Sequence, residues 1–178
     1  MIIALDLATK TGVALGDPGT IPICFTEVLG DAGDHHGARM AQALRMMSRL
    51  IEKYQPHLIV LEAPIGVHGG GSKRRPEVLM GLRGCVMGVA HMRNIPFEQH
   101  EVSTIRKHFL GVGNLKRVDA KRATVKRCGM LGWTVHNDDE ADACALWDLA
   151  CARRSRSHSI ATTPLFGKEA SNGPRAAK

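Results

Sequence analysis

Short apolar runs separated by turn-forming residues fill the first 29 positions of the chain. We predict strands over residues 1–7, 11–15 and 23–29, with a turn at the sequence Gly-Asp-Pro-Gly of residues 16–19. Three strands joined by short turns predict an antiparallel meander. From residue 37 to residue 54 the apolar period becomes that of a helix, and the predicted buried face carries Met40, Leu44, Met47, Ile51 and Tyr54.

The rest of the chain alternates between strand-like and helix-like patterns. Residues 57–61 (HLIVL) predict a strand buried on both faces, and the glycine-rich stretch 66–72 predicts a loop. The later elements are a helix over 76–93 with Val78, Leu82, Val86 and Val89 on one face, a strand over 97–102, a short helix capped by Ser103 and ended by Gly111, a basic helix over 117–130 and a last helix over 138–154. This order predicts an α/β fold, a mixed sheet with helices on both faces.

Composition and charge narrow the class of protein. The 178 residues are 44% hydrophobic and carry a net charge of +7, which favours a folded domain with a polyanionic partner and excludes wholesale disorder. No apolar run is long enough for a membrane span, and the first residues lack the basic region of a secretion signal. Five cysteines without a C-x-x-C pair indicate a reducing, cytoplasmic location. We expect one domain over residues 1–153 and a basic, flexible tail over 154–178.

Four acidic residues stand where a folded domain has little structural use for a charge. Asp6 follows the apolar run of the first predicted strand, and Glu62 ends the most apolar one. Asp139 and Asp142 are three residues apart near the start of the last helix and therefore share one of its faces. Carboxylates gathered together repel one another unless cations neutralise them, and oxygen ligands from several elements suit Mg²⁺. Two such ions suit in-line hydrolysis of a phosphodiester.

Each acid also has an ordinary structural interpretation. Asp139 could be an N-terminal acid that the helix dipole favours, Asp142 a solvated residue, and Asp6 a turn former. Glu62 has no obvious capping role. The four acids together favour a metal site more strongly than any one of them does.

The residues around these acids resemble the RuvC family of Holliday-junction resolvases. The matching stretches are Asp6 followed by Thr11-Gly12, VLEAP around Glu62, Leu82-Arg83-Gly84, the segment from Val102 to Lys121, and Asp139-Glu-Ala-Asp142. The resemblance covers residues 1–152 and implies the ribonuclease-H-like fold, with a mixed five-stranded sheet. It also implies a site of four carboxylates and two Mg²⁺ ions, with Mn²⁺ as a substitute, whose ligands are Asp6, Glu62, Asp139 and Asp142.

The same resemblance implies further roles. Lys121 corresponds to a family lysine near the scissile phosphate, and Arg106 to a basic position in the preceding helix. The implied enzyme is a homodimer, and the helix over residues 76–93 would form much of its interface. The sequence differs from the family at Leu7-Ala8, where Pro-Gly is usual, and at Ile65, in place of an aromatic residue that inserts at the junction centre. Such divergence suits an enzyme from a phage or another mobile element.

Basic residues concentrate in a few segments beside the predicted acids. Solvated helix faces would explain them in the ordinary way. A phosphate-contacting surface would instead give salt-dependent affinity with little sequence preference. The candidate DNA contacts are Lys73, Arg74, Arg75, Arg83, Arg106, Lys116, Arg117, Arg122 and Lys126.

The leading prediction is an endonuclease that resolves Holliday junctions by paired symmetric nicks, in DNA recombination and repair. One alternative is a related nuclease acting on flaps, other branched DNA or RNA–DNA hybrids. Another is a non-catalytic nucleic-acid-binding protein, against which the presence of all four acids argues. A kinase-like relative on the same fold would need a longer chain and a second glycine-rich phosphate loop.

Overall fold

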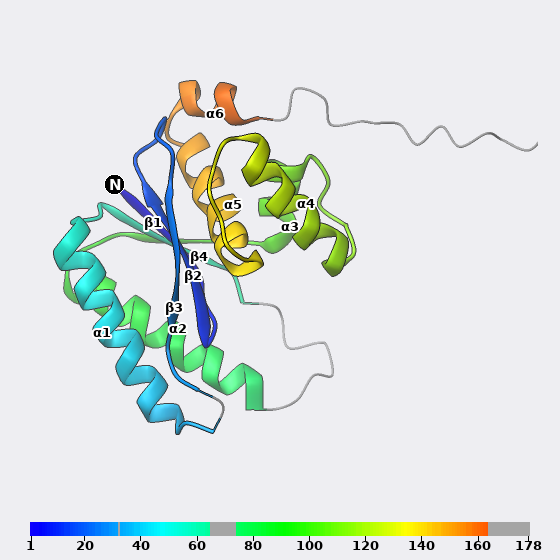
Figure 1. The fold of residues 1–178 in the computed structure, drawn as a ribbon. Coiled ribbons are helices and arrows are strands. Elements are labelled where there is room, and N and C mark those ends of the chain that lie inside the picture. The colour runs from blue at the N-terminus through cyan, green and yellow to red at the C-terminus, as the bar shows by residue number, and fades with distance from the viewer. Residues whose placement is uncertain (32, 65–73, 164–178) are drawn as a thin grey trace, which may run out of the picture.

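The strands and helices follow the predicted order. The computed structural model describes residues 1–31, 33–64 and 74–163, apart from the side chains of 74–76 (Figure 1). Its strands are β1 (Ile2–Asp6), β2 (Lys10–Gly16), β3 (Ile23–Val28), β4 (Leu58–Glu62) and β5 (Phe97–His100). Its helices are α1 (His36–Tyr54), α2 (Arg74–Met92), α3 (Val102–Leu110), α4 (Arg117–Met130), α5 (Asp138–Ala152) and α6 (Arg156–Thr162).

The five strands form one mixed sheet in the order β3-β2-β1-β4-β5. The predicted meander pairs β1 with β2 and β2 with β3 in antiparallel register. β4 and β5 continue the sheet in parallel with β1, each after a crossover through a helix. The carboxyl ends of β1 and β4 therefore lie side by side in the middle of the sheet.

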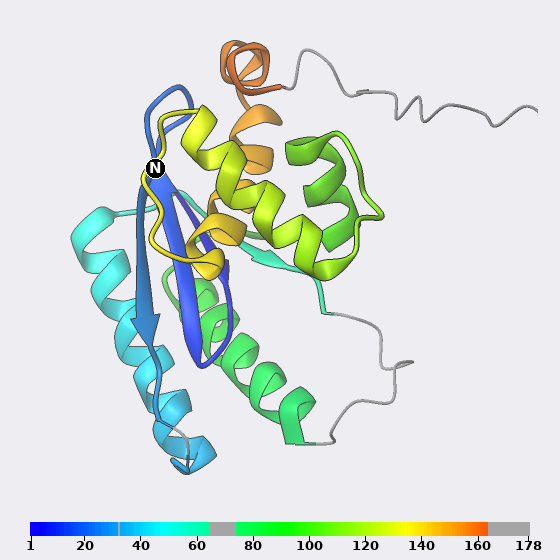
Figure 2. The same ribbon diagram turned by 45° about the vertical axis from the view of Figure 1, so that its right-hand side comes forward.

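Each face of the sheet builds its own apolar core. Ile3 and Leu5 of β1 pack with α1 and α2, whereas Ile2 and Ala4 pack with α5 on the opposite face. Figures 1 and 2 show α1 and α2 together on one side of the sheet, and α3, α4 and α5 on the other. Small residues such as Ala143 and Cys144 let α5 approach the strands closely.

Two predicted helix faces need correction. On α1 the core residues are Ala43, Met46, Met47, Leu50 and Ile51, while the predicted Leu44 is 40% exposed. The helical period was correct, but the buried stripe is rotated towards Ala43. On α2 the apolar stripe that includes Val86 and Val89 is buried against the sheet and α1, so it does not form a dimer interface.

Two predicted boundaries around β5 and α3 also shift. β5 ends at His100, not at residue 102. The N-cap of α3 is Glu101 in extended conformation, so the predicted cap Ser103 lies inside the helix. The predicted end of α3 at Gly111 is confirmed, and that glycine takes a φ of 77°.

The folded domain extends beyond the predicted boundary at residue 153. α6 follows α5 directly, and its His158 is only 2% exposed. His158 Nε2 lies 2.9 Å from the buried Asp148 Oδ1 of α5, and the imidazole meets the Trp147 ring edge to face. For residues 156–162 the prediction of a tail was wrong, because these contacts and a hydrogen bond from the Gly19 amide to His158 Nδ1 anchor a segment that is polar in sequence. Residues 164–178 of the predicted tail lie outside the described residues.

Two further expectations concern cysteines and membranes. All five cysteines are free thiols, as predicted. Within the described ranges, none of the helices combines the length and the apolar character needed to cross a bilayer.

Candidate active site

The alternation of side chains along β1 and β4 puts two acids on the α5 face of the sheet. Ala4 faces α5, so Asp6, two residues further, faces the same side. Val60 and Glu62 repeat this relation on β4. The parallel register pairs Leu5 with Leu61, so Asp6 and Glu62 end neighbouring strands at the same level. The sheet therefore brings the first two predicted ligands together.

A close approach of α5 to β2 brings in the second pair of acids. Gly12 pairs with Asp6 across the antiparallel ladder and faces α5. A Cβ at this position would overlap the Asp139 carbonyl group and lie 3.0 Å from the Glu140 amide nitrogen. Only glycine fits here, because the first turn of α5 rests on the strand backbone. Asp139 lies in this turn and Asp142 follows three residues later, which places both above the sheet next to Asp6.

A buried polar cluster fixes the start of α5, and sequence reasoning missed it. The Asn137 side chain caps the helix by accepting from the Glu140 amide at 2.9 Å. Glu140 is only 3% exposed and accepts from Thr26 Oγ1 of β3 and from the His136 amide, each at 2.8 Å. Burial alone would raise the pKa of Glu140, but these hydrogen bonds hold it below its usual value. The spacing Asn137-x-x-Glu140 was the available signal, because it is that of a capping box.

Burial raises the pKa of all four predicted ligands, and neighbouring carboxylates raise these pKa values further. Burial, and then the Glu62 carboxylate, raise the pKa of Asp6 well above its usual range. Burial and the Asp142 carboxylate raise the pKa of Glu62 to about 7. Burial raises the pKa of Asp142 to about 6 despite the nearby Lys121, and burial also raises that of Asp139. The fold has thus gathered carboxylates without supplying enough positive charge to neutralise them.

Lys121 of α4 borders this acid cluster. Its ammonium forms an ion pair with Asp138 and lies 3.8 Å from Asp139 Oδ1. Partial burial would lower the pKa of Lys121, but the hydrogen bond to Asp138 and the surrounding carboxylates raise it. The lysine is therefore charged at neutral pH and stands beside the acids. Asp138 was not among the predicted site residues.

Arg83 occupies a different place from the one predicted. Its side chain is only 8% exposed, and Nη1 donates to the Glu62 carbonyl oxygen at 2.5 Å. Nη2 is also buried, and no hydrogen-bond partner for it is present among the described residues. We therefore reassign Arg83 from DNA contact to positioning, because it holds the end of β4 and its charge lowers the pKa of Glu62.

The other predicted DNA contacts divide into three groups. Arg106 is partly buried and close enough to Glu62 and Asp142 to lower the pKa of both. Four residues are exposed around α4: Lys116, Arg117, Arg122 and Lys126. The side chains of Lys73, Arg74 and Arg75 lie outside the described residues. Lys10, which sequence reasoning missed, is exposed at the start of β2 and lowers the pKa of Asp139.

The donor set fits divalent metal ions only as an open site. No group of three or more His, Cys, Asp or Glu side chains within residues 1–31, 33–64 and 74–163 could hold a metal ion by itself. Mg²⁺, however, is usually held by one or two carboxylates together with water and substrate phosphates. Two pairs of carboxylates with raised pKa values match that requirement, because cations would relieve their mutual repulsion.

Comparisons with known proteins agree at the level of the fold. No family model matches the sequence, and no curated protein does. The structure of Thermus thermophilus RuvC in complex with Holliday junction substrate superposes with a TM-score of 0.65 at 14% identity, over 92% of this chain and 98% of that one. Another Thermus thermophilus RuvC structure gives 0.64 at 14% identity, over 92% and 99% of the two chains. The yeast mitochondrial Holliday junction resolvase gives 0.58 at 16% identity, over 89% and 82%.

At these identities the likeness establishes the fold. The chain has the ribonuclease-H-like α/β fold of the RuvC structures, with a mixed five-stranded sheet and helices on both faces, as predicted.

Proposed function

We propose that this protein is a metal-dependent endonuclease that resolves four-way DNA junctions. The observation that carries the proposal is the convergence of Asp6, Glu62, Asp139 and Asp142 from three elements of a RuvC-like fold, with raised pKa values. A cluster that destabilises its own ionised form is typical of a functional site. The exposed basic residues of α4 beside it supply a surface for a polyanion.

Each residue has a separate part in the proposed reaction. The four carboxylates would hold two Mg²⁺ or Mn²⁺ ions, which would act as Lewis acids toward the phosphodiester. Lys121 is charged and partly exposed beside Asp139, so it can stabilise negative charge that develops on the phosphate. Arg83 and Gly12 fix the backbone around Glu62 and Asp139.

Paired nicks require two active sites, and we propose that a homodimer supplies them. The inner stripe of α2 is buried in the domain, so the interface needs another surface. The outward face of α2 carries Met80, 56% exposed, followed by Gly84 and Gly88, whose Cα positions have open space around them. Two glycines on the same face as an exposed methionine would let a second helix pack closely against α2.

A cleavage panel tests the proposed function. Equal concentrations of a mobile four-way junction, a flap, an RNA–DNA hybrid and a linear duplex are incubated with the protein, with Mg²⁺ or with EDTA. We expect Mg²⁺-dependent, symmetric nicks in the junction at least tenfold faster than cleavage of the duplex. Faster cleavage of the flap or hybrid would support the alternative of a related nuclease. Absence of any Mg²⁺-dependent cleavage would contradict nuclease activity.

A further inference from the structure

The outward face of α4 carries an apolar groove, although the helix is rich in Lys and Arg. Val118 is 60% exposed and Val125 38% exposed, and their spacing of seven residues puts them on one face. The opposite face packs into the domain through Ala120, Thr124 and Cys128. The groove is lined by Val118, Lys121, Arg122, Val125, Lys126 and Asp138. An exposed helix face normally carries polar residues at such positions, so the two valines need an explanation.

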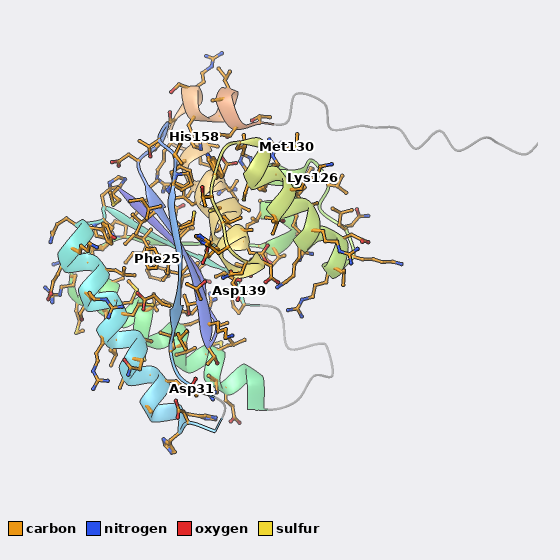
Figure 3. The ribbon with its side chains drawn as sticks, in the orientation of Figure 1. Phe25, Asp31, Lys126, Met130, Asp139 and His158 are labelled. Carbon is orange, nitrogen blue, oxygen red and sulfur yellow. The ribbon has the colours of Figure 1, made fainter. Side chains whose placement is uncertain are left out.

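The charges around the groove identify the kind of molecule that would cover it. Asp138 is already paired with Lys121. Arg122 and Lys126 are exposed, and neither forms an ion pair with any residue that the structure describes. Figure 3 shows Lys126 on α4, away from the sheet. The complementary occupant is therefore apolar on one side and anionic on the other.

An unstacked nucleotide has this combination. In an intact duplex the faces of the bases are covered by their neighbours, so a duplex offers the groove base edges, sugars and phosphates but no base face. At a branch or an unpaired position, a base can leave the stack and pack its face against apolar side chains. Its phosphates would then reach Arg122 and Lys126 at the rim.

The groove adjoins the candidate active site, because Lys121 lines the groove and also stands 3.8 Å from Asp139. A nucleotide in the groove would thus be close in sequence to the reacting phosphate. We propose that the groove holds one unstacked nucleotide of the branched DNA, with its base on Val118 and Val125 and its phosphates on Arg122 and Lys126. This inference rests on the proposed function and adds a determinant of substrate choice to it.

Coupling between protein and DNA changes tests the proposal. Binding of the full chain to a four-way junction is measured with Ca²⁺ in place of Mg²⁺, so that cleavage does not interfere. Single abasic residues are placed in turn at each position within five nucleotides of the branch. For the wild-type protein, we expect one position at which loss of the base weakens binding about fivefold.

The double variant Val118→Ser, Val125→Ser should bind the intact junction about fivefold more weakly and show no further loss with that abasic residue. The matched controls are Val28→Ser on β3 and Val112→Ser, whose valines are 55% and 40% exposed and lie outside the groove. They should retain the full effect of the abasic residue. All these positions are exposed, so the variants should melt at the wild-type temperature.

Three results would overturn the assignment. If the losses of affinity from the double variant and from the abasic residue are additive at every position, the groove holds no base. Nuclease activity in the cleavage panel would in that case still support the proposed function. A change in oligomeric state of the double variant by light scattering would identify the groove as a protein–protein contact. A wild-type protein that binds no branched DNA would overturn both the proposed function and the groove.

Discussion

Helix α5 carries carboxylates in its first two turns and in its second half, and their pKa values shift in opposite directions. At its start, Asp142 faces Asp6 and Glu62, and all three have raised pKa values. Two turns further on, Asp148 is completely buried, yet its pKa is lowered to about 2. In Figure 3, Asp139 marks the start of the helix and His158 lies beyond its end.

The partners explain the difference. His108 Nε2 lies 2.7 Å from Asp148 Oδ2, and His158 Nε2 lies 2.9 Å from Oδ1, so hydrogen bonds overcome the cost of burial. At the start of α5, the charges of Lys121 and Arg106 offset the effect of burial only in part, so the pKa values of the acids stay raised. A carboxylate with its partners inside the fold contributes to stability, whereas a cluster without them depends on charge from outside the chain. This contrast separates a structural acid from a candidate metal ligand.

The largest effect on the cleavage rate is expected from the acids around the start of α5, whose charges the chain neutralises only in part. Asp6→Asn or Glu62→Gln should slow junction cleavage by about a thousandfold, because each removes charge from the metal site. Junction affinity should stay within about threefold, since the basic surface is unchanged. Single-turnover cleavage and a binding titration measure the two quantities. Asp119→Asn, an exposed acid on α4, is the control, and near-normal turnover of Asp6→Asn would refute the site.

At Asp148, an effect on the stability of the fold is expected. Asp148→Asn should lower the free energy of unfolding by about 3 kcal/mol, because it removes the charge that two buried histidine contacts satisfy. Urea denaturation measures the loss, and Asp31→Asn, at an exposed loop position, should change stability by less than about 0.5 kcal/mol. The lowered pKa also predicts that this contribution is present above about pH 4 and is lost as the pH falls towards 2. An Asp148→Asn protein as stable as wild type would contradict the stabilising role of Asp148 and its contrast with the candidate metal ligands.

Smaller effects on cleavage and on DNA binding are expected from two lysines of α4, Lys121 beside the acid cluster and Lys126 on the exposed surface. Lys121→Ala should slow cleavage about fiftyfold and weaken junction binding only about twofold, because its charge stands beside the reacting phosphate. Lys126→Ala should do the reverse, with weaker binding and a salt slope reduced by about one unit. Cleavage rates and titrations at several salt concentrations separate the two roles. Equal effects of both variants on affinity alone would contradict a catalytic part for Lys121.

The hydrophobic period and the positions of the acids along the chain were sufficient to predict the acids of the candidate active site. The apolar runs place Asp6 and Glu62 at the ends of two strands, and three-residue spacing places Asp139 and Asp142 on one helix face. That the two strands are neighbours is known only from the structure. The antiparallel meander and the parallel crossovers followed from the same patterns, as did the order of the elements.

The buried Asp148 cluster depends on contacts between distant segments, which no local sequence pattern contains. Asp148 contacts His108, which is 40 residues away in the sequence. It also contacts His158, which belongs to a stretch whose composition resembles a solvated tail. The inward stripe of α2 had the right spacing, but the sequence did not say whether the domain or a second copy buries it. The sequence predicted that Arg83 is a surface cation, whereas its guanidinium donates to the Glu62 carbonyl oxygen inside the fold.

The comparison is tested most directly by melting the protein across pH 5 to 8, with Mg²⁺ and with EDTA. Raised pKa values mean that the folded protein binds more protons than the unfolded chain between about pH 4 and 7, so the metal-free protein should lose stability as the pH rises through that window. Mg²⁺ should reverse this loss and add about 1–2 kcal/mol at pH 8, or roughly 3–5 °C, with little effect at pH 5. In Asp6→Asn the Mg²⁺ effect should largely disappear. A Mg²⁺ shift that is equal at both pH values, or equal in wild type and Asp6→Asn, would contradict the account.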